Sequence, residues 1–166
     1  MRSTSLVERI RRASDALAFL APLATRVVLG LAFLQTGLGK WRNFDNTIQF
    51  FASLGLPAPT ANAALVATLE LVGGIALILG LGTRFFALGL SSTMVVALLT
   101  ADRADFLAAW APASDKGPTD IVAFAFLLWL LWLVFYGAGT MSLDRLVSRF
   151  RTAGAHSVQR ATQELP

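Results

Sequence analysis

Two charged residues, Arg26 and Glu70, stand inside long apolar stretches of the sequence. Ionisable residues at membrane depth are costly, and they usually face the interior of a helix bundle and find a partner there. If each stretch is a helix, Arg26 lies roughly 10 Å and Glu70 roughly 15 Å above the same end. An arginine side chain can bridge that difference, so the sequence predicts a buried Arg26–Glu70 ion pair. The pair is either a packing clamp or a functional group, namely the floor of a ligand cavity or a proton-handling pair.

Helical spacing places both charges on stripes that also contain glycine. At about 100° per residue, the first stripe holds Arg26, Gly30, Phe33, Gly37 and Lys40. The matching second stripe holds Ala63, Val66, Glu70, Gly74 and Leu77. Glycine lets two helix backbones approach closely, which is the usual device of helix packing in membranes. The two stripes are therefore predicted to face each other.

A ligand pocket is predicted between the first, second and fourth apolar stretches, open towards the outer face of the membrane. Its floor is Arg26 and Glu70, its rim is Lys40 and Asp120, and Phe33 lies on its wall. A quinone suits such a site, because cationic side chains donate to its carbonyls while apolar walls hold its ring and tail. A lipid tail could fill the same space. The alternative interpretation is that charges at these ends only mark a membrane interface.

The composition restricts the class of protein that can position these residues. Of the 166 residues, 55% are hydrophobic and 14% are charged, and the mean hydropathy is +0.64. A soluble domain usually carries about 25% charged residues, so a soluble globular protein and a disordered chain are both excluded. The absence of cysteine excludes disulfides, thiolate metal sites and Fe–S clusters. His156 is the single histidine and lies in a polar tail, so neither a metal nor a haem cofactor is expected.

Four apolar stretches qualify as membrane spans, because a helix needs about 20 apolar residues to cross the hydrocarbon core. They cover about residues 17–39, 62–81, 83–101 and 120–138. The second and third are joined by the short link LGLGTR (79–84), which predicts an antiparallel helical hairpin. The predicted fold is an all-α, integral membrane four-helix bundle. A cleaved signal peptide is the alternative for the first stretch, but Arg26 and the lack of a clean cleavage site argue against it.

The charges outside the spans predict an orientation. Nine Lys and Arg residues flank the side that holds both termini, whereas four flank the other side. Loops rich in Lys and Arg stay in the cytoplasm, so both termini are expected there. Residues 1–16 and 139–151 are predicted to be basic amphipathic helices that bind lipid headgroups, and residues 152–166 a disordered tail. Because the arginines flank apolar runs, lipids are the expected partners and nucleic acid is not.

The two halves of the chain resemble each other. Each reads as a span, an outer loop and a span, and each loop carries an aromatic stretch ending at proline, at 50–57 and 106–112. Related halves of the same orientation would form a parallel repeat about an axis along the membrane normal. Two unrelated hairpins that look alike by chance are the alternative.

Five short motifs together resemble the DoxX family of small bacterial membrane proteins. They are TGLGK (36–40), FFASLGLP (50–57), ELVGG (70–74), LGLGTR (79–84) and GAGTMSLD (137–144). The resemblance covers about residues 20–147 and implies a four-helix bundle in the inner membrane with a link to quinone-dependent oxidation. Carried over residue by residue, the family pattern points to Arg26, Lys40, Glu70, Arg84 and Asp144. This chain departs from it at Asp102 and Arg103, where many relatives place histidine, which argues against histidine-based redox chemistry.

Three functions are compatible with these observations. The first is a quinone- or lipid-binding subunit of a membrane oxidoreductase, whose redox centre lies in a partner; whether this chain itself reacts with the quinone stays open. The second is a small carrier for an apolar or weakly acidic molecule, with Arg26, Lys40 and Glu70 along its path. The third is a passive anchor for a partner. The candidate partners are membrane lipids, an oxidoreductase subunit and a second copy of the chain.

Overall fold

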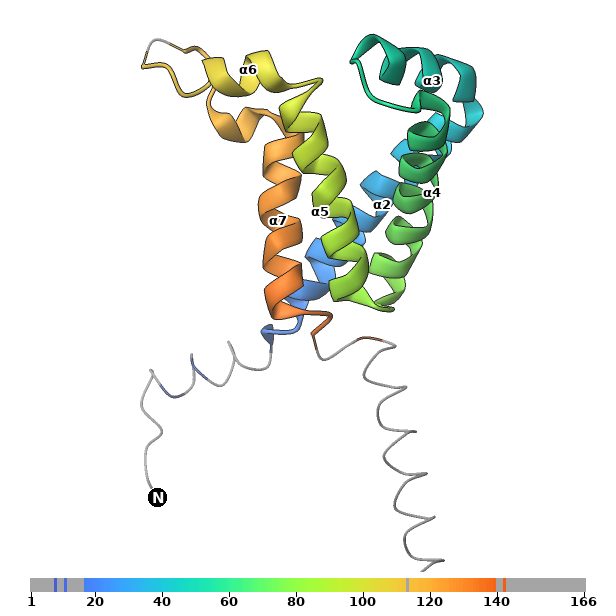
Figure 1. Cartoon of the computed structure of the whole chain (residues 1–166). Helices are drawn as coiled ribbons and strands as arrows, with labels where there is room; N and C mark the ends of the chain where they lie inside the picture. Colours follow the sequence, from blue (N-terminus) through green and yellow to red (C-terminus); the bar gives the residue numbers. More distant parts are fainter. Residues whose placement is uncertain (1–7, 9–10, 12–16, 113, 140–141, 143–166) are drawn as a thin grey trace, which may run out of the picture.

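The computed structural model describes residues 8, 11, 17–112, 114–139 and 142, and within these ranges every regular element is helical (Figure 1). The α-helices are α2 (Leu20–Arg42), α3 (Phe44–Ser53), α4 (Pro59–Leu79), α5 (Thr83–Leu99), α6 (Arg103–Ala108) and α7 (Val122–Tyr136). A short 3₁₀ helix, η1 (Pro118–Asp120), precedes α7. The all-α prediction is thus confirmed for the described ranges. The predicted terminal helices and tail lie outside them, apart from Glu8, Arg11, Gly139 and Ser142.

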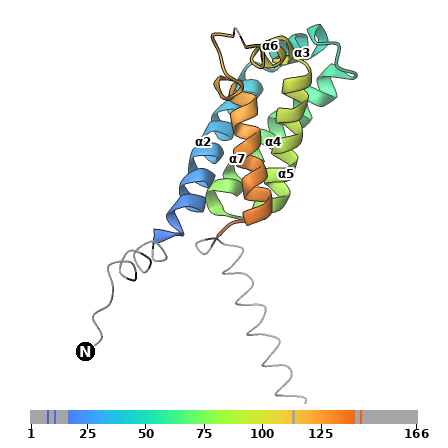
Figure 2. The same cartoon turned by 90° about the vertical axis from the view of Figure 1, so that its left-hand side faces the viewer.

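The four long helices coincide with the four predicted apolar stretches. α2 packs along α4, α5 packs along α7, and α4 and α5 join the two pairs (Figures 1 and 2). Two of these helices, α2 and α4, are long and apolar enough to cross a membrane, whereas the apolar helices α5 and α7 are shorter. A membrane crossing by all four stretches stays a prediction.

The turn between α4 and α5 is as short as the sequence predicts. Gly80 ends α4 with φ 71°, and Gly82 precedes α5 with φ 52°. Glycine adopts this left-handed conformation without steric cost and is the usual residue after a helix end. The two helices therefore reverse direction within three residues.

α2 and α4 approach each other along the predicted glycine stripes. A Cβ atom on Gly30 would lie 2.7 Å from the Gly74 carbonyl oxygen, and one on Gly37 would lie 2.6 Å from the Leu71 nitrogen. Real Cβ atoms do not come this close to backbone, so only glycine allows this separation of the helices. The predicted packing of the two stripes is confirmed.

The main hydrophobic core lies at the end of the molecule where α4 turns into α5. Its buried members are Leu29, Phe33, Leu77, Ala87, Leu90, Leu130 and Leu133. A smaller cluster lies towards the opposite end, where α6 covers α5 and α7, and consists of Leu98, Ala109, Ile121 and Ala123.

Apart from η1, both halves of the chain have the same order of elements, a long helix, a short helix and a long helix. The short helices α3 and α6 both lie at the end opposite the α4–α5 turn (Figure 1). This is the arrangement that the predicted repeat requires.

Candidate functional site

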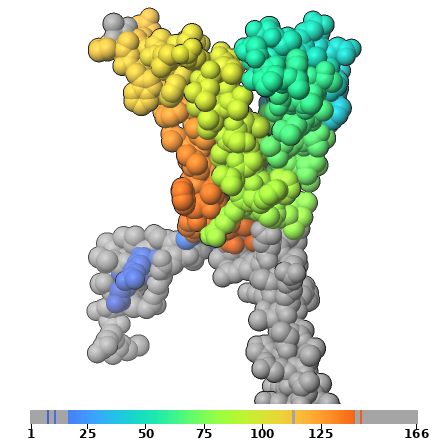
Figure 3. Space-filling view, in the orientation of Figure 1, coloured from blue at the N-terminus to red at the C-terminus, as the bar shows by residue number. Residues whose placement is uncertain are grey.

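A cavity of about 390 Å³ lies between α3, α4 and α5. The space-filling view shows the surface hollowed between α5 and the α3–α4 side, at the end where α3 lies (Figure 3). Most of the lining is apolar and includes Phe50 and Phe51 of α3. The polar lining residues are Lys40, Asn62, Glu70, Ser92, Thr93 and Thr100.

Lys40 and Glu70 form an ion pair on the wall of this cavity. The Lys40 Nζ donates to Glu70 Oε2 at 2.6 Å, and the two side chains are 26% and 4% exposed. An ammonium group has three N–H donors, so two remain for a ligand. Glu70 Oε1 makes no hydrogen bond to any described residue. The pair therefore supplies both donors and an acceptor on the wall of a mostly apolar cavity.

The end of α2 holds Lys40 in this position. Gly37, one turn earlier, brings the backbone of α2 against Leu71, the neighbour of Glu70. α2 then breaks at Asn43, where Thr47 of α3 donates to the carbonyl oxygens of Lys40 at 3.3 Å and Asn43 at 3.0 Å. The close contact of Gly37 with α4 on one side, and the hydrogen bonds of Thr47 at the end of α2 on the other, thus fix the position of Lys40.

The prediction that Arg26 pairs with Glu70 is wrong. Arg26 is 2% exposed, and its guanidinium donates to the carbonyl oxygens of Leu77 at 3.0 Å and Ile78 at 3.3 Å, and also to that of Ala138. These carbonyls lie at the C-terminal end of α4 and just beyond α7, where carbonyl groups are available to side-chain donors. Arg26 therefore acts as a clamp that holds its own helix α2, the end of α4 and the segment after α7 together.

The offset between α2 and α4 explains the error. The glycine contacts align Gly30 with Gly74, which puts Arg26 level with Ile78 in the last turn of α4. Glu70 lies eight residues earlier, about 12 Å along the helix axis. The predicted pair requires the start of α2 and the end of α4 to lie at the same height, whereas α2 extends beyond the end of α4. Lys40, at the other end of the same stripe, is the residue that reaches Glu70.

Two further predicted site residues also lie away from the cavity. Phe33 is 2% exposed in the core, with its ring centroid 5.6 Å from that of Phe126. Asp120 is exposed at η1, where its Oδ2 accepts a hydrogen bond from the Gly117 nitrogen at 2.8 Å. The cavity that holds Lys40 and Glu70 is thus bounded by α5, not by α7 as the sequence analysis expected.

A second hollow, of about 340 Å³, lies between α2 and α7. Its lining is apolar apart from Thr25 and includes Val28, Phe126 and Trp129. None of the predicted site residues lines it. Its lining thus contains no charged group that could select a ligand headgroup.

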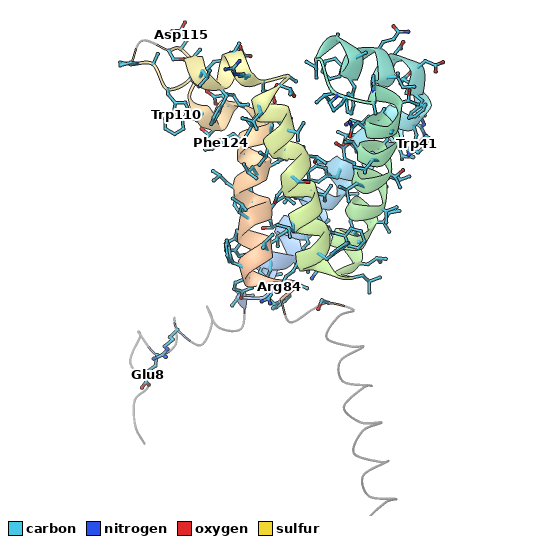
Figure 4. All side chains as sticks on the ribbon, in the orientation of Figure 1. Glu8, Trp41, Arg84, Trp110, Asp115 and Phe124 are labelled. Carbon is cyan, nitrogen blue, oxygen red and sulfur yellow. The ribbon has the colours of Figure 1, made fainter. Side chains whose placement is uncertain are left out.

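Arg84, another residue of the predicted family pattern, binds the backbone at the end of a helix. Arg84 lies at the end opposite Trp41 (Figure 4) and donates to the Phe135 carbonyl oxygen at 3.3 Å, at the C-terminal end of α7. Asp102 immediately precedes α6 and, like Arg103, does not line the cavity. Asp144 lies outside the described residues.

Sequence reasoning missed the contribution of α5. Ser92 and Thr93 line the cavity opposite α4, and their hydroxyls donate to the carbonyl oxygens of Gly89 at 2.6 Å and Leu90 at 2.8 Å. Their oxygen atoms can still accept hydrogen bonds. The run Ser91–Ser92–Thr93 in the middle of an apolar stretch was the available signal. Within the described ranges no group of three or more His, Asp or Glu side chains could hold a metal ion.

The chain matches known proteins over most of its helical region. The DoxX family model matches residues 21–103. The chain is 33% identical to "Inner membrane protein YphA" of Escherichia coli over 132 residues, which are 74% of this chain and 87% of YphA. It is 36% identical to "Uncharacterized membrane protein Rv3486" of Mycobacterium tuberculosis over 140 residues, which are 79% of this chain and 83% of that protein.

A third relative carries an activity in its name. The chain is 38% identical to "Putative oxidoreductase CatD" of Bacillus subtilis over 78 residues, which are 47% of this chain. That match spans 57% of the length of CatD. No solved structure matches the chain significantly.

Proposed function

Because the chain belongs to the DoxX family of membrane proteins, we propose that it crosses a bacterial inner membrane with four helices and binds a quinone beside Lys40 and Glu70. In this function it is a subunit that serves a membrane oxidoreductase. The observation that carries the proposal is the Lys40–Glu70 ion pair on the wall of a mostly apolar cavity of about 390 Å³.

The charge distribution supports an orientation for this membrane protein. Arg26 and Arg84 lie at the end of the molecule where α2 begins and α7 ends. Most Lys and Arg residues that flank the predicted spans also belong to the segments at that end. This distribution favours a cytoplasmic location for that end of the molecule. The cavity end, with α3 and α6, then faces the opposite side of the membrane. The relative named inner membrane protein YphA supports the choice of membrane.

The chemistry of the ion pair suits a carbonyl-bearing ring. A Lys40 N–H not used by Glu70 donates to one quinone oxygen, and the ring lies among apolar side chains such as Phe51 and Met94. Glu70 Oε1 accepts a hydrogen bond from a hydroxyl group when the bound molecule is the reduced quinol. The described residues supply polar contacts for the ring, and a partner polypeptide supplies the electrons. The relative CatD, named as a proposed oxidoreductase, supports this choice of reaction class.

Quinone binding to purified variants tests the proposal. Lys40→Met removes the donor, so we expect quinone affinity to fall about tenfold, the effect of one lost charge-assisted hydrogen bond. Lys116→Met is the matched control, because Lys116 is the other lysine of the chain, is exposed and does not line the cavity. Wild-type protein that binds no quinone, or a Lys40→Met protein that binds it as well as wild type, would contradict the proposal.

A carrier for an apolar or weakly acidic molecule is the second candidate. The cavity lies between α4 and α5, the helices at which the two halves of the chain meet, and transporters built from repeats commonly bind their substrates between the repeats. Uptake of a radiolabelled weak acid into proteoliposomes, with loss of uptake in Glu70→Gln, would favour this function over quinone binding.

A further inference from the structure

α4 and α5 are close together near their turn and separate above it. A Cβ atom on Gly73 would lie 3.1 Å from the Leu90 side chain, and one on Gly89 would lie 3.2 Å from that of Leu69. The cavity begins immediately above this contact, at Glu70 on α4 and Ser92 on α5. The two helices thus form a closed floor and a gap that widens towards α3 (Figures 1 and 3).

Apolar residues form the edges of this gap. Leu65 on α4 is 59% exposed and Val96 on α5 is 44% exposed, and both also line the cavity. A side chain that lines a cavity and is also exposed stands on its rim. These two residues therefore stand on one rim of the cavity, on a face that lipid would cover if the helices span a membrane. The ion pair lies at its inner wall, with Glu70 only 3% exposed.

The volume of the cavity limits what it can enclose. Pockets for drug-sized ligands have about 300–1,000 Å³, and this cavity of about 390 Å³ lies at the small end of that range. It can hold a substituted ring and the first part of a tail. The rest of a long tail must leave, and lipid receives it without cost, because lipid chains are as apolar as leucine side chains.

We propose that the site takes a long-tailed amphiphile, with a carbonyl-bearing head at Lys40 and Glu70 and an alkyl or isoprenoid tail that leaves between Leu65 and Val96 into the lipid. The head is the quinone of the proposed function, on which this inference rests. The tail route adds the substrate class, a membrane-dissolved quinone in preference to a small water-soluble one. It also adds the direction from which the ligand enters, which is sideways from the half of the bilayer that surrounds α3 and α6.

Two quinones and one pair of variants test the tail route. The probes are a benzoquinone without a tail and the same ring with a decyl tail, with the protein in lipid nanodiscs and bound quinone measured by mass spectrometry. Val96→Trp narrows the gap, and we expect it to weaken binding of the decyl quinone about tenfold, as overpacking of a tight contact does. Binding of the tailless ring should stay within about twofold of wild type, an amount smaller than the cost of one lost hydrogen bond.

Val95→Trp is the control for Val96→Trp. Val95 is 40% exposed on the same helix and does not line the cavity, so this variant should bind both quinones as wild type does. Leu65→Trp on α4 repeats the test from the other edge, with Val72→Trp as its control, because Val72 is 45% exposed and lies away from the cavity.

The outcomes separate this inference from the proposed function. If Val96→Trp and Leu65→Trp weaken binding of both quinones equally, or of neither, the tail route is wrong while the quinone site stands. If wild-type protein binds neither quinone, both the tail route and the proposed function are wrong. Selective loss of the decyl quinone in both edge variants, with both controls unchanged, supports the route.

Discussion

Buried Arg26 and half-buried Lys40, both on α2, illustrate how differently arginine and lysine are used. The Arg26 guanidinium presents five N–H donors in a rigid plane, and the structure spends them on carbonyl oxygens of Leu77, Ile78 and Ala138. The Lys40 ammonium is a compact charge on a flexible stem, and it makes one bond to Glu70 while keeping donors towards the cavity. The first residue stabilises the fold and the second is available for binding.

Arg26→Met should lower thermal stability in detergent without a specific effect on the ligand site. It leaves three carbonyl oxygens without their charged donor, and each such bond contributes about 1.5–3 kcal/mol. Arg42→Met, at an exposed arginine of the same helix, should cost less than about 0.5 kcal/mol. Equal losses of melting temperature in the two variants would show that the clamp does not stabilise the protein.

The Lys40–Glu70 pair should show energetic coupling that Arg26 and Glu70 lack. Lys40→Met alone leaves the buried Glu70 carboxylate unpaired, which costs about 3–5 kcal/mol. Glu70→Leu alone leaves Lys40, whose side chain is 26% exposed, and should cost less. The double variant removes both charges and should be more stable than that sum predicts, by about 0.5–3 kcal/mol. The same cycle with Arg26→Leu and Glu70→Leu should be additive. Denaturation in mild detergent measures both cycles, and coupling in the second alone would reverse our assignment of the partner.

At the scale of elements, glycine determines how the site is assembled. Gly37 and Gly39 are two residues apart on α2, yet a Cβ atom on Gly37 would lie 2.6 Å from the Leu71 nitrogen, while one on Gly39 would meet nothing within 4 Å. One glycine is required by the contact with α4, and the other is free to change. The distance between Lys40 and Glu70 depends on the first.

Gly37→Ala should therefore impair both stability and quinone binding. The added methyl group forces α2 and α4 apart, at a cost of about 1–3 kcal/mol for overpacking, and moves Lys40 away from Glu70. Gly39→Ala should be neutral or stabilising by up to about 1 kcal/mol, because alanine favours the helix. Melting temperature and quinone affinity measured on the two variants check this, and indistinguishable variants would contradict it.

The sequence alone predicts some of these features and not others, for physical reasons. Apolar length and glycine spacing indicate four helices and the facing stripes of α2 and α4, because both signals are local. The vertical offset between α2 and α4 depends on contacts between residues more than 30 positions apart, such as Gly30 and Gly74, so the partner of Glu70 was predicted incorrectly. Apart from Arg84 in its first turn, α5 carries only short hydroxyl side chains among apolar ones, and the run Ser91–Ser92–Thr93 was too weak a signal to predict that this helix lines the site.

At the scale of the whole molecule, the chain has two ends of different character. The arginine-clamped end is tightly packed around Leu77 and Leu133, both fully buried. The opposite end carries α3, α6 and the open cavity, together with aromatic side chains such as Trp110, which contacts Phe124 (Figure 4). Aromatic residues are typical of the membrane–water interface. In the proposed orientation, this end and its cavity face away from the cytoplasm.

Because the sequence contains no cysteine, single introduced cysteines can test the proposed orientation. In it the α4–α5 turn faces the cytoplasm, and the end with α3 and α6 faces the opposite side of the membrane. Leu81→Cys places a thiol in the exposed α4–α5 turn, and Thr119→Cys places one in the exposed segment before α7. In intact cells a membrane-impermeant thiol reagent should label the cysteine at 119 and leave that at 81 unlabelled until the membrane is opened. The reverse pattern would show that the cavity opens towards the cytoplasm.

The unequal lengths of the helices have a consequence for the surrounding bilayer. α2 has 23 residues and α7 has 15, which correspond to about 34 Å and 22 Å, against a hydrocarbon thickness of about 30 Å. If both cross the membrane as we propose, α2 must tilt, while lipids beside α7 must shorten or the bilayer must thin, at fractions of a kcal/mol per Å. The bilayer around the protein would thus be thinner beside α7 than beside α2. The melting temperature of the protein should be higher in bilayers with short acyl chains than in thick ones. A neighbouring membrane protein with equally short helices would share the thinned region of the bilayer.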